Sequence, residues 1–244
     1  MAAFPVGAGA PQFLPVFGRH ERYVVTAALD HVFVCCAVGA PEADVLTRFG
    51  LKEGSPNTHL GQGTACRRFF FHNAYLELFW VADPQEAQSD AVRPTRLWDR
   101  WINRGRAACP FGIVLRPAAD AADPKPPFPT WAYRPCYLPP QIAIEIARDT
   151  PLSEPAFFYL GFQRGRARVA QEPVTHGIPA SEITGIRIGT PAPGPRSAAA
   201  EAVQAAGLVA IHEADQFLME LTFDRATHGG SVDLRPTLPL VLRW

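Results

Sequence analysis

His31 and Glu77 are polar residues that stand inside strongly apolar stretches of the chain. His31 lies near the start of the run 29–34, and Glu77 lies in the middle of the run 75–80. A carboxylate buried in such a strand loses its hydration and must be paired or metal-bound to stay ionised. An imidazole nitrogen and a carboxylate oxygen are both good ligands for Zn, Fe, Mn or Ni. Two interpretations therefore stay open: a divalent metal held by both residues, or a hydrogen-bonded pair without a metal.

A second group of polar residues lies in the segment 59–68. Gly61 and Gly63 allow the backbone to approach a ligand closely, because they have no Cβ atom. An arginine such as Arg68 suits a bidentate grip on a carboxylate or a phosphate. The opposing interpretation is a plain turn leading into a strand, with the arginine solvated and His59 in a structural or surface role.

Alternation along the strand predicted over 67–71 decides which of these side chains share a face. Successive residues of a strand point to opposite faces, so Cys66, Arg68 and Phe70 lie together. We expect Arg68 to face a concave sheet and to fix the polar end of a bound molecule. The full set of ligand-binding candidates is His59, Gln62, Thr64, Arg68, Phe70, Tyr75 and Phe33.

These residues need a sheet to hold them, and the block 23–83 has the pattern of one. An apolar run over 29–38 predicts a strand, and a short helical pattern then begins at Pro41 and ends at Gly50. Two aromatic strands complete the block. Its order is therefore strand, helix, then strands.

The rest of the chain repeats this order less clearly. A helix predicted over 94–103 links the first block to a second at 109–162, where β-branched residues alternate as in a strand. A third block at 182–244 again has the order strand, helix, then strands. We predict an α+β fold in which repeated βαβββ modules form a cupped mixed β-sheet with helices on the outside. Residues 1–22 are predicted to be an N-terminal arm.

The motifs of the first block resemble those of the glyoxalase/bleomycin-resistance/extradiol-dioxygenase superfamily, also called the vicinal oxygen chelate superfamily. The resemblance rests on LDHV at 29–32, HLGQGTACRRFFF at 59–71 and YLEL at 75–78. It is close over the first block and architectural only over the later ones. It implies that residues 23–83 and 109–162 are paired glyoxalase-like modules around one small-molecule cup, with 182–244 as an additional module.

The resemblance also implies a metal site shared by two modules. His31 and Glu77 match the first module's pair of ligands, and Glu145 stands where a second carboxylate is expected. The opening strand of the second block has no histidine, so three protein ligands can be assembled, and three ligands plus water can form a catalytic site. The implied chemistry is that of a metal-dependent lyase, isomerase or dioxygenase acting on vicinal oxygens, with Glu77 and Glu145 as catalytic carboxylates and Zn, Mn, Fe or Ni as cofactor. The alternative is a metal-free protein that binds or sequesters a small molecule.

Composition narrows the expected partners. The chain has 23 basic and 23 acidic residues, and this balance lacks the basic surface typical of a nucleic-acid binder. No apolar run approaches the roughly 20 residues that span a bilayer, so we do not expect a membrane to be a partner of the chain. The adjacent Cys35 and Cys36 lie in an apolar run, and the cysteine spacing predicts buried thiols in a reducing cytoplasm. We expect a small-molecule ligand, and a homodimer is left open.

Overall fold

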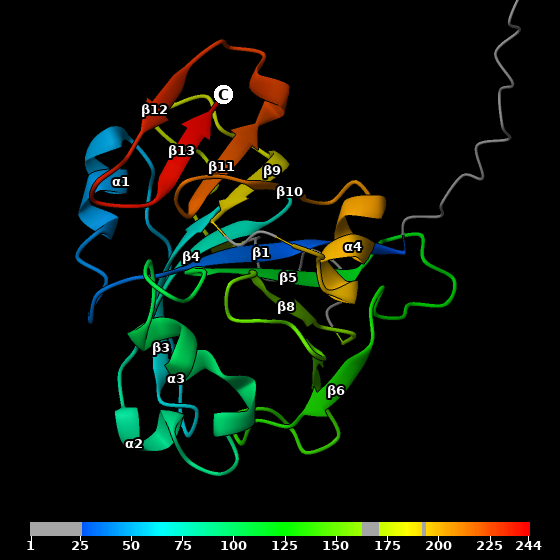
Figure 1. Cartoon of the computed structure of the whole chain (residues 1–244). Helices are drawn as coiled ribbons and strands as arrows, with labels where there is room; N and C mark the ends of the chain where they lie inside the picture. The colour runs from blue at the N-terminus through cyan, green and yellow to red at the C-terminus, as the bar shows by residue number, and fades with distance from the viewer. Residues whose placement is uncertain (1–25, 163–170, 192–193) are drawn as a thin grey trace, which may run out of the picture.

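The computed structural model describes residues 26–162, 171–191 and 194–244 (Figure 1). The predicted N-terminal arm, 1–22, lies outside these described residues. The fold is α+β, as predicted, with two mixed β-sheets and short helices. The elements in chain order are β1 (Ala27–Cys35), α1 (Ala43–Phe49), β2 (Asn57–His59), β3 (Thr64–Phe70), β4 (Tyr75–Val81), α2 (Pro84–Ala87), η1 (Arg93–Thr95), α3 (Leu97–Ile102), β5 (Phe111–Pro117), β6 (Thr130–Tyr133), β7 (Ile144–Ala147), β8 (Ala156–Tyr159), β9 (Ile183–Thr190), α4 (Ala198–Ala205), β10 (Ala210–Glu213), β11 (Leu218–Phe223), η3 (Asp224–Ala226), β12 (Ser231–Asp233) and β13 (Leu240–Arg243).

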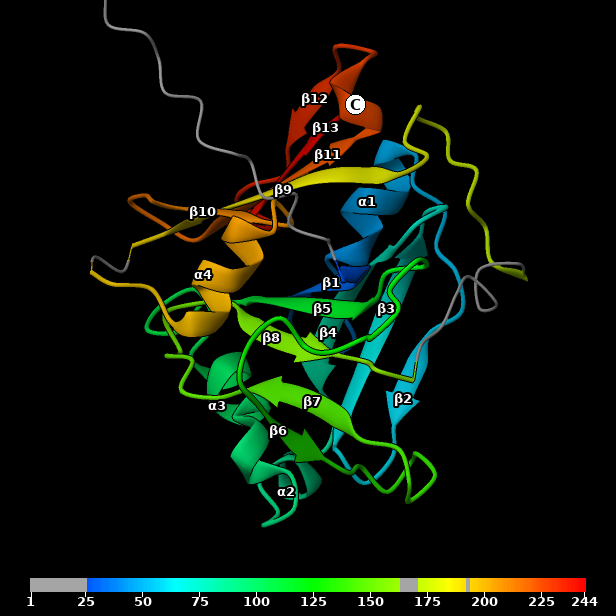
Figure 2. The same ribbon diagram turned by 90° about the vertical axis from the view of Figure 1, so that its right-hand side faces the viewer.

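The larger sheet has eight strands in the order β2-β3-β4-β1-β5-β8-β7-β6 and curls into a half-barrel (Figure 2). At its centre β1 pairs antiparallel with β5. β1 also pairs parallel with β4, and β5 pairs parallel with β8. The partner of His31 is Tyr75 and the partner of Gly112 is Ala156, so in both pairs the partner lies 44 residues later in the chain (75 − 31 and 156 − 112). Two halves with the same strand pairing therefore meet at the β1–β5 seam.

The smaller sheet has five strands in the order β10-β9-β11-β13-β12. β9 pairs parallel with β10 and antiparallel with β11, whereas β1 of the larger sheet pairs with β4 and β5. Helix α4 forms the crossover that the parallel β9–β10 pair requires. The order strand, helix, strands is present in this region as predicted, but its pairing differs from that of either half of the larger sheet.

Apolar side chains fill both faces of the larger sheet. In β1, Val32 and Val34 join a core that the two sheets share, while Phe33 and Cys35 join a second core on the concave face. Because side chains alternate along a strand, β1 serves both cores at once. Helix α3 contributes Leu97 to the second core, so it covers part of the concave face rather than the outside, where the sequence predicted the helices.

Several element boundaries differ from the prediction, and two of these differences have a backbone cause. The helix predicted over 94–103 is interrupted at Arg96, whose φ is 57°, and is therefore divided into η1 and α3. The residues 131–138 of the second block have the apolar and aromatic content of a strand, which predicts a strand over this range. The strand ends at Tyr133 instead, because Pro135 has no N–H to donate to a ladder. The residues that follow form a loop beside the concave face.

Four of the five cysteines, including Cys35 and Cys36, are buried free thiols, and Cys136 is exposed. Burial raises the pKa of Cys35 and Cys109 to about 12, so these thiols are protonated at neutral pH. In the part of the chain that the structure describes, no helix is long and apolar enough to cross a membrane.

Candidate small-molecule site

A cavity of about 290 Å³, called here the cup cavity, opens on the concave face of the larger sheet. Residues of β1, β4, β5 and β8 form its floor, and the β6–β7 connection and the start of α3 contribute to its sides. Its apolar lining is Phe33, Phe79, Leu97, Val114, Leu138, Ile144, Phe158, Leu160 and Phe162. Its polar lining is His31, Asn57, Thr58, His59, Gln62, Tyr75, Thr95, Tyr133 and Tyr137. None of the described residues that line it is a lysine, arginine, aspartate or glutamate.

Strand alternation brings the aromatic floor of the cup cavity together. His31 and Phe33 lie two residues apart in β1, so both face the cavity. The ring of Phe33 lies 5.2 Å from that of Phe79 and 6.0 Å from that of Phe158. Gly112 pairs with Phe33 across the seam, and a Cβ atom there would collide with the Phe33 ring. The floor is therefore built from both halves of the sheet.

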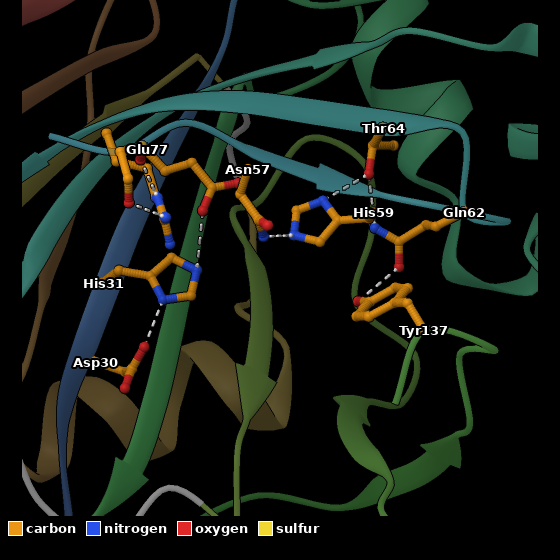
Figure 3. A network of polar contacts seen from close by, with 10 residues as sticks. Asp30, His31, Asn57, His59, Gln62, Thr64, Glu77 and Tyr137 are labelled. Carbon is orange, nitrogen blue, oxygen red and sulfur yellow. Dashed lines mark hydrogen bonds and ion pairs between the residues drawn. The ribbon is translucent and has the colours of Figure 1, made fainter. Parts of the chain in front are cut away.

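His31 lies between two carboxylates at the edge of the cup cavity (Figure 3). Its Nδ1 is 2.7 Å from Oδ1 of Asp30, and its Nε2 is 3.6 Å from Oε2 of Glu77. Its ring stacks on Tyr75 with centroids 4.3 Å apart. With Asp30 ionised, Nδ1 carries the proton and donates it, which fixes the orientation of the imidazole. His31 and Glu77 are thus neighbours, but 3.6 Å is too long for the predicted hydrogen bond between them.

Glu77 is only 4% exposed and does not line the cavity itself. It pairs in register with Arg68 on the neighbouring strand β3. Burial, followed by the negative charge of Glu77, raises the pKa of the Cys66 thiol, which shares a hydrogen bond with this carboxylate. A neutral thiol is a donor, so Cys66 helps to satisfy the buried carboxylate.

A chain of hydrogen bonds runs along one side of the cup cavity (Figure 3). Nδ2 of Asn57 donates to Nε2 of His59 at 2.9 Å, so His59 carries its proton on Nδ1, 3.0 Å from Oγ1 of Thr64. Nε2 of Gln62 donates to the same Thr64 oxygen at 2.8 Å. The hydroxyl of Tyr137 donates to Oε1 of Gln62 at 3.3 Å. Of these side chains, Asn57, His59, Gln62 and Tyr137 line the cavity and present hydrogen-bond donors and acceptors to it.

The tyrosines of the cup cavity are uncharged at neutral pH. Burial raises the pKa of Tyr133 to about 12. Burial likewise raises the pKa of Tyr75 and of Tyr137 well above the usual range of a phenol. Each hydroxyl therefore keeps its proton and remains able to donate.

Four of the predicted ligand-binding residues line the cup cavity: Phe33, His59, Gln62 and Tyr75. Thr64, Arg68 and Phe70 lie on the same face of β3 but do not line it. The guanidinium of Arg68 is turned toward Ser55 instead, with Nε donating to the Ser55 carbonyl and Nη2 to its hydroxyl, each at 2.8 Å. Alternation thus predicted the face of Arg68, and in this structure its guanidinium hydrogen-bonds to the loop at Ser55 and Pro56.

Glu145 lies on the opposite face of the sheet, so the predicted three-ligand metal site does not form. It pairs in register with Tyr159, a residue of the core that the two sheets share, whereas the next residue, Ile146, belongs to the concave core. Its Oε2 accepts a hydrogen bond of 2.6 Å from Oγ1 of Thr130. A step of one residue along a strand reverses the face. Glu145 therefore cannot join His31 or act on a molecule in the cup cavity.

His31 and Glu77 alone do not fit the metal site that the resemblance implies. Catalytic zinc sites commonly use three protein ligands and keep the fourth position open. The described residues contain no group of three His, Cys, Asp or Glu side chains that could hold a metal ion. The nearby Asp30 already accepts from His31. The chain's own residues thus supply one imidazole and one carboxylate, and we assign no metal to the cup cavity.

Comparison with known proteins assigns no family to the chain. No protein-family model and no curated protein matches it. Among solved structures, the chain is similar to the crystal structure of a hypothetical protein from Staphylococcus aureus, with 10% sequence identity and a TM-score of 0.46. The alignment covers 89% of this chain and 98% of that one. At this distance the similarity carries no argument about function.

The sequence analysis did not identify several residues of the cup cavity. Phe158 and Ile144 come from strands of the second half, and the alternation that identified Phe33 could have identified them too. Tyr137 follows the end of β6, and Asn57 belongs to the three-residue strand β2. No local pattern indicates that these two side chains face the same cavity.

Proposed function

We propose that the chain binds a small, uncharged and mainly apolar molecule in the cup cavity, without a metal. The observation that carries this proposal is the cavity itself, which combines about 290 Å³ of space with aromatic walls and a polar edge that contains no Lys, Arg, Asp or Glu among the described lining residues. Ligand pockets usually measure roughly 300–1,000 Å³ and have mostly apolar walls with a few polar groups. The volume is at the lower end of that range, so a small ligand is favoured.

The lining favours a neutral aromatic molecule over an ion. An ionised carboxylate in the cavity would lose its hydration, and no lysine or arginine among the described lining residues would replace it. A ring can pack against Phe33 and Phe79, since aromatic pairs add to the free energy of area burial. A hydroxyl or carbonyl group can bond to Gln62 or Tyr137. Phenols, aryl alcohols and aryl ketones have this combination.

Three ligands of similar shape and different charge test the proposal: benzyl alcohol, benzoate and benzylammonium. We expect ligand-detected NMR to show saturable binding of benzyl alcohol and at least tenfold weaker binding of the two ions. Phe79→Leu removes part of the aromatic floor and is expected to weaken benzyl alcohol binding. Phe49→Leu is the matched control, since Phe49 packs against Trp244 outside the cavity, and it is expected to have no effect.

Two results would overturn the proposal. One is benzoate or benzylammonium binding as tightly as benzyl alcohol, or a loss of binding that is equal in Phe79→Leu and Phe49→Leu. The other is a stoichiometric metal, found by elemental analysis of protein purified without chelator or histidine tag, that disappears in both His31→Ala and Glu77→Ala. The second result would restore the metal-dependent interpretation.

A second candidate function, proton transfer, is supported by the position of His31. The bond from Nδ1 to Asp30 leaves Nε2 as the nitrogen able to accept a proton at the cavity edge. Removal of a proton from carbon is a step common to isomerases and lyases. In acetophenone, a neutral aryl ketone, a methyl C–H proton would pass to Nε2 and a solvent proton would return to carbon. We expect deuterium from D₂O to enter the methyl group and this exchange to be lost in His31→Gln; equal exchange in both proteins would reject this candidate and leave binding intact.

We also infer that the two halves of the larger sheet are copies of one βαβββ-type module of the glyoxalase-like superfamily. The support is the mirrored strand order and the same 44-residue spacing in the two parallel pairs. The second half has no helix between β5 and β6, where prolines interrupt the segment 118–129. In this view the module with His31 supplies most of the polar lining of the cup together with Phe33 and Phe79. The other module supplies Val114, Ile144 and Phe158 together with Tyr133 and Tyr137.

A further inference from the structure

A second cavity, of about 570 Å³, shares part of its wall with the cup cavity. Thr95 and Phe158 line both. We call the second one the arginine cavity, because Arg96, Arg100 and Arg148 line it. No predicted site residue and no step of the proposed function uses this space.

Arg100 is the most enclosed of these three arginines, with 4% of its surface exposed. Its Nη1 donates to the carbonyl oxygens of Cys109 at 2.6 Å, Glu154 at 2.7 Å and Leu152 at 3.3 Å. These bonds fix the guanidinium but bring it no negative charge. Among the described residues it forms no ion pair, since the Glu154 carboxylate accepts from the backbone and hydroxyl of Ser197 instead.

Arg100 has donors that no described residue uses. A guanidinium has five N–H donors, and Nη1 supplies two of them. The hydrogen bonds of Arg100 to described residues all use Nη1, and Arg100 lines the cavity, so Nε and Nη2 are the donors it has left for a ligand there. Burial lowers the pKa of Arg100, because a buried cation loses its hydration. The nearby Cys109, Cys35 and Glu154 oppose this only in part. A bound anion would offset the loss of hydration.

Arg148 and Arg96 add positive charge at more accessible positions. Nε of Arg148 donates to the Thr130 carbonyl at 2.6 Å, which leaves its two terminal nitrogens for another partner. Arg96 is half-exposed, and its Nε lies 3.8 Å from Asp99. One acidic residue, Asp149, is among the described residues that line the cavity. Three guanidinium groups against one carboxylate give the lining an excess of positive charge.

We propose that the arginine cavity binds a small oxyanion, such as a phosphate or carboxylate group, with Arg100 as the inner ligand and Arg96 and Arg148 at the rim. The planar fork of a guanidinium matches two oxygens of such a group, and these charge-assisted hydrogen bonds are about twice as strong as neutral ones. This is a second site, and it does not rest on the uncharged ligand proposed for the cup cavity.

Calorimetric titration with inorganic phosphate, and separately with acetate, tests the site at low ionic strength, where charge attraction is least screened. We expect one equivalent to bind, and the preferred anion identifies the phosphate or the carboxylate form of the site. Arg96→Gln and Arg148→Gln keep the Arg100 bonds and are each expected to weaken binding about tenfold. Arg93→Gln is the matched control, since Arg93 is an exposed arginine that does not line the cavity.

Arg100→Lys keeps the charge but removes the fork, so a folded Arg100→Lys protein, checked by circular dichroism, is expected to bind neither anion. The proposal is overturned if neither anion binds saturably, or if Arg93→Gln weakens binding as much as the rim variants do. Benzyl alcohol binding, measured on the same four variants, is expected to be unchanged. The two sites can therefore fail independently of each other.

Discussion

The cup cavity and the arginine cavity share Thr95 and Phe158 but differ in the chemistry of their walls. The central strands line the cup cavity, and there alternation places aromatic and aliphatic side chains beside polar groups, none of them Lys, Arg, Asp or Glu among the described lining residues. The arginine cavity is lined by the α3 region and by the segment 146–152, where β7 ends. Outside a regular strand, side chains do not alternate between two faces. Arginines from the α3 region and from the segment 146–152 can therefore line the same cavity. Two neighbouring spaces can therefore select ligands of opposite character.

Removing the ring of Phe158 would break this separation most directly. We expect Phe158→Ala to lower the free energy of unfolding by about 3 kcal/mol, at the low end of the range for a buried phenylalanine, because part of the ring faces open space. The joined space should then accept phenyl phosphate, a ring with an oxyanion, more tightly than the wild type does. Urea denaturation and calorimetry measure the two effects. Unchanged phenyl phosphate affinity would mean that this ring does not separate the cavities, and Phe49→Ala is the control.

Replacing Arg100 would sharpen the comparison from the side of the arginine cavity. We expect Arg100→Gln to lower the free energy of unfolding by about 2 kcal/mol, because the carbonyls of Cys109, Leu152 and Glu154 lose their shared donor. Urea denaturation measures this loss beside Arg93→Gln, which should change stability by less than about 0.5 kcal/mol. Equal stability of the two variants would show that Arg100 does not hold these carbonyls.

The matching change on the side of the cup cavity is Gln62→Leu. Thr64 loses a donor and the Tyr137 hydroxyl loses its acceptor, so we expect the free energy of unfolding to fall by about 1 kcal/mol. Benzyl alcohol binding should weaken while phosphate binding stays the same. Gln85→Leu, at an exposed position on α2, is the control for the change in side-chain chemistry. A weakening of phosphate binding in Gln62→Leu would contradict the independence of the two sites.

The smallest effect concerns the alkaline limit of stability. Burial raises the pKa of Tyr133 from 10.0 to about 12, so between these values the unfolded chain loses this proton while the folded chain keeps it. The stabilisation is complete below pH 10 and is lost as the pH rises to about 12. We expect the free energy of unfolding to fall across this window, and to fall less steeply in Tyr133→Phe. Identical slopes for both proteins would show that Tyr133 does not titrate as described.

The sequence predicted strands at the positions of β1, β3 and β4 in the first half, but not the three-residue strand β2. Tyr75–Val81 is a strand as predicted, and alternation correctly grouped Cys66, Arg68 and Phe70. Alternation over β7 also separated Glu145 from Ile144 and Ile146. What it could not show is which of those two faces is concave, because that depends on how β7 pairs with β8 and how the whole sheet curls.

The sequence by itself determined local properties: periodicity, the apolar strands, and the helix end set by Gly50. These follow from steric and hydrogen-bonding rules that act between residues near in the chain. Only the tertiary structure decided that Tyr137 meets Gln62, that Arg68 turns to Ser55, and that Arg96, Arg100 and Arg148 border one cavity. Such contacts join segments that are far apart in the chain. They depend on the order and curvature of the sheet, which no local sequence pattern encodes.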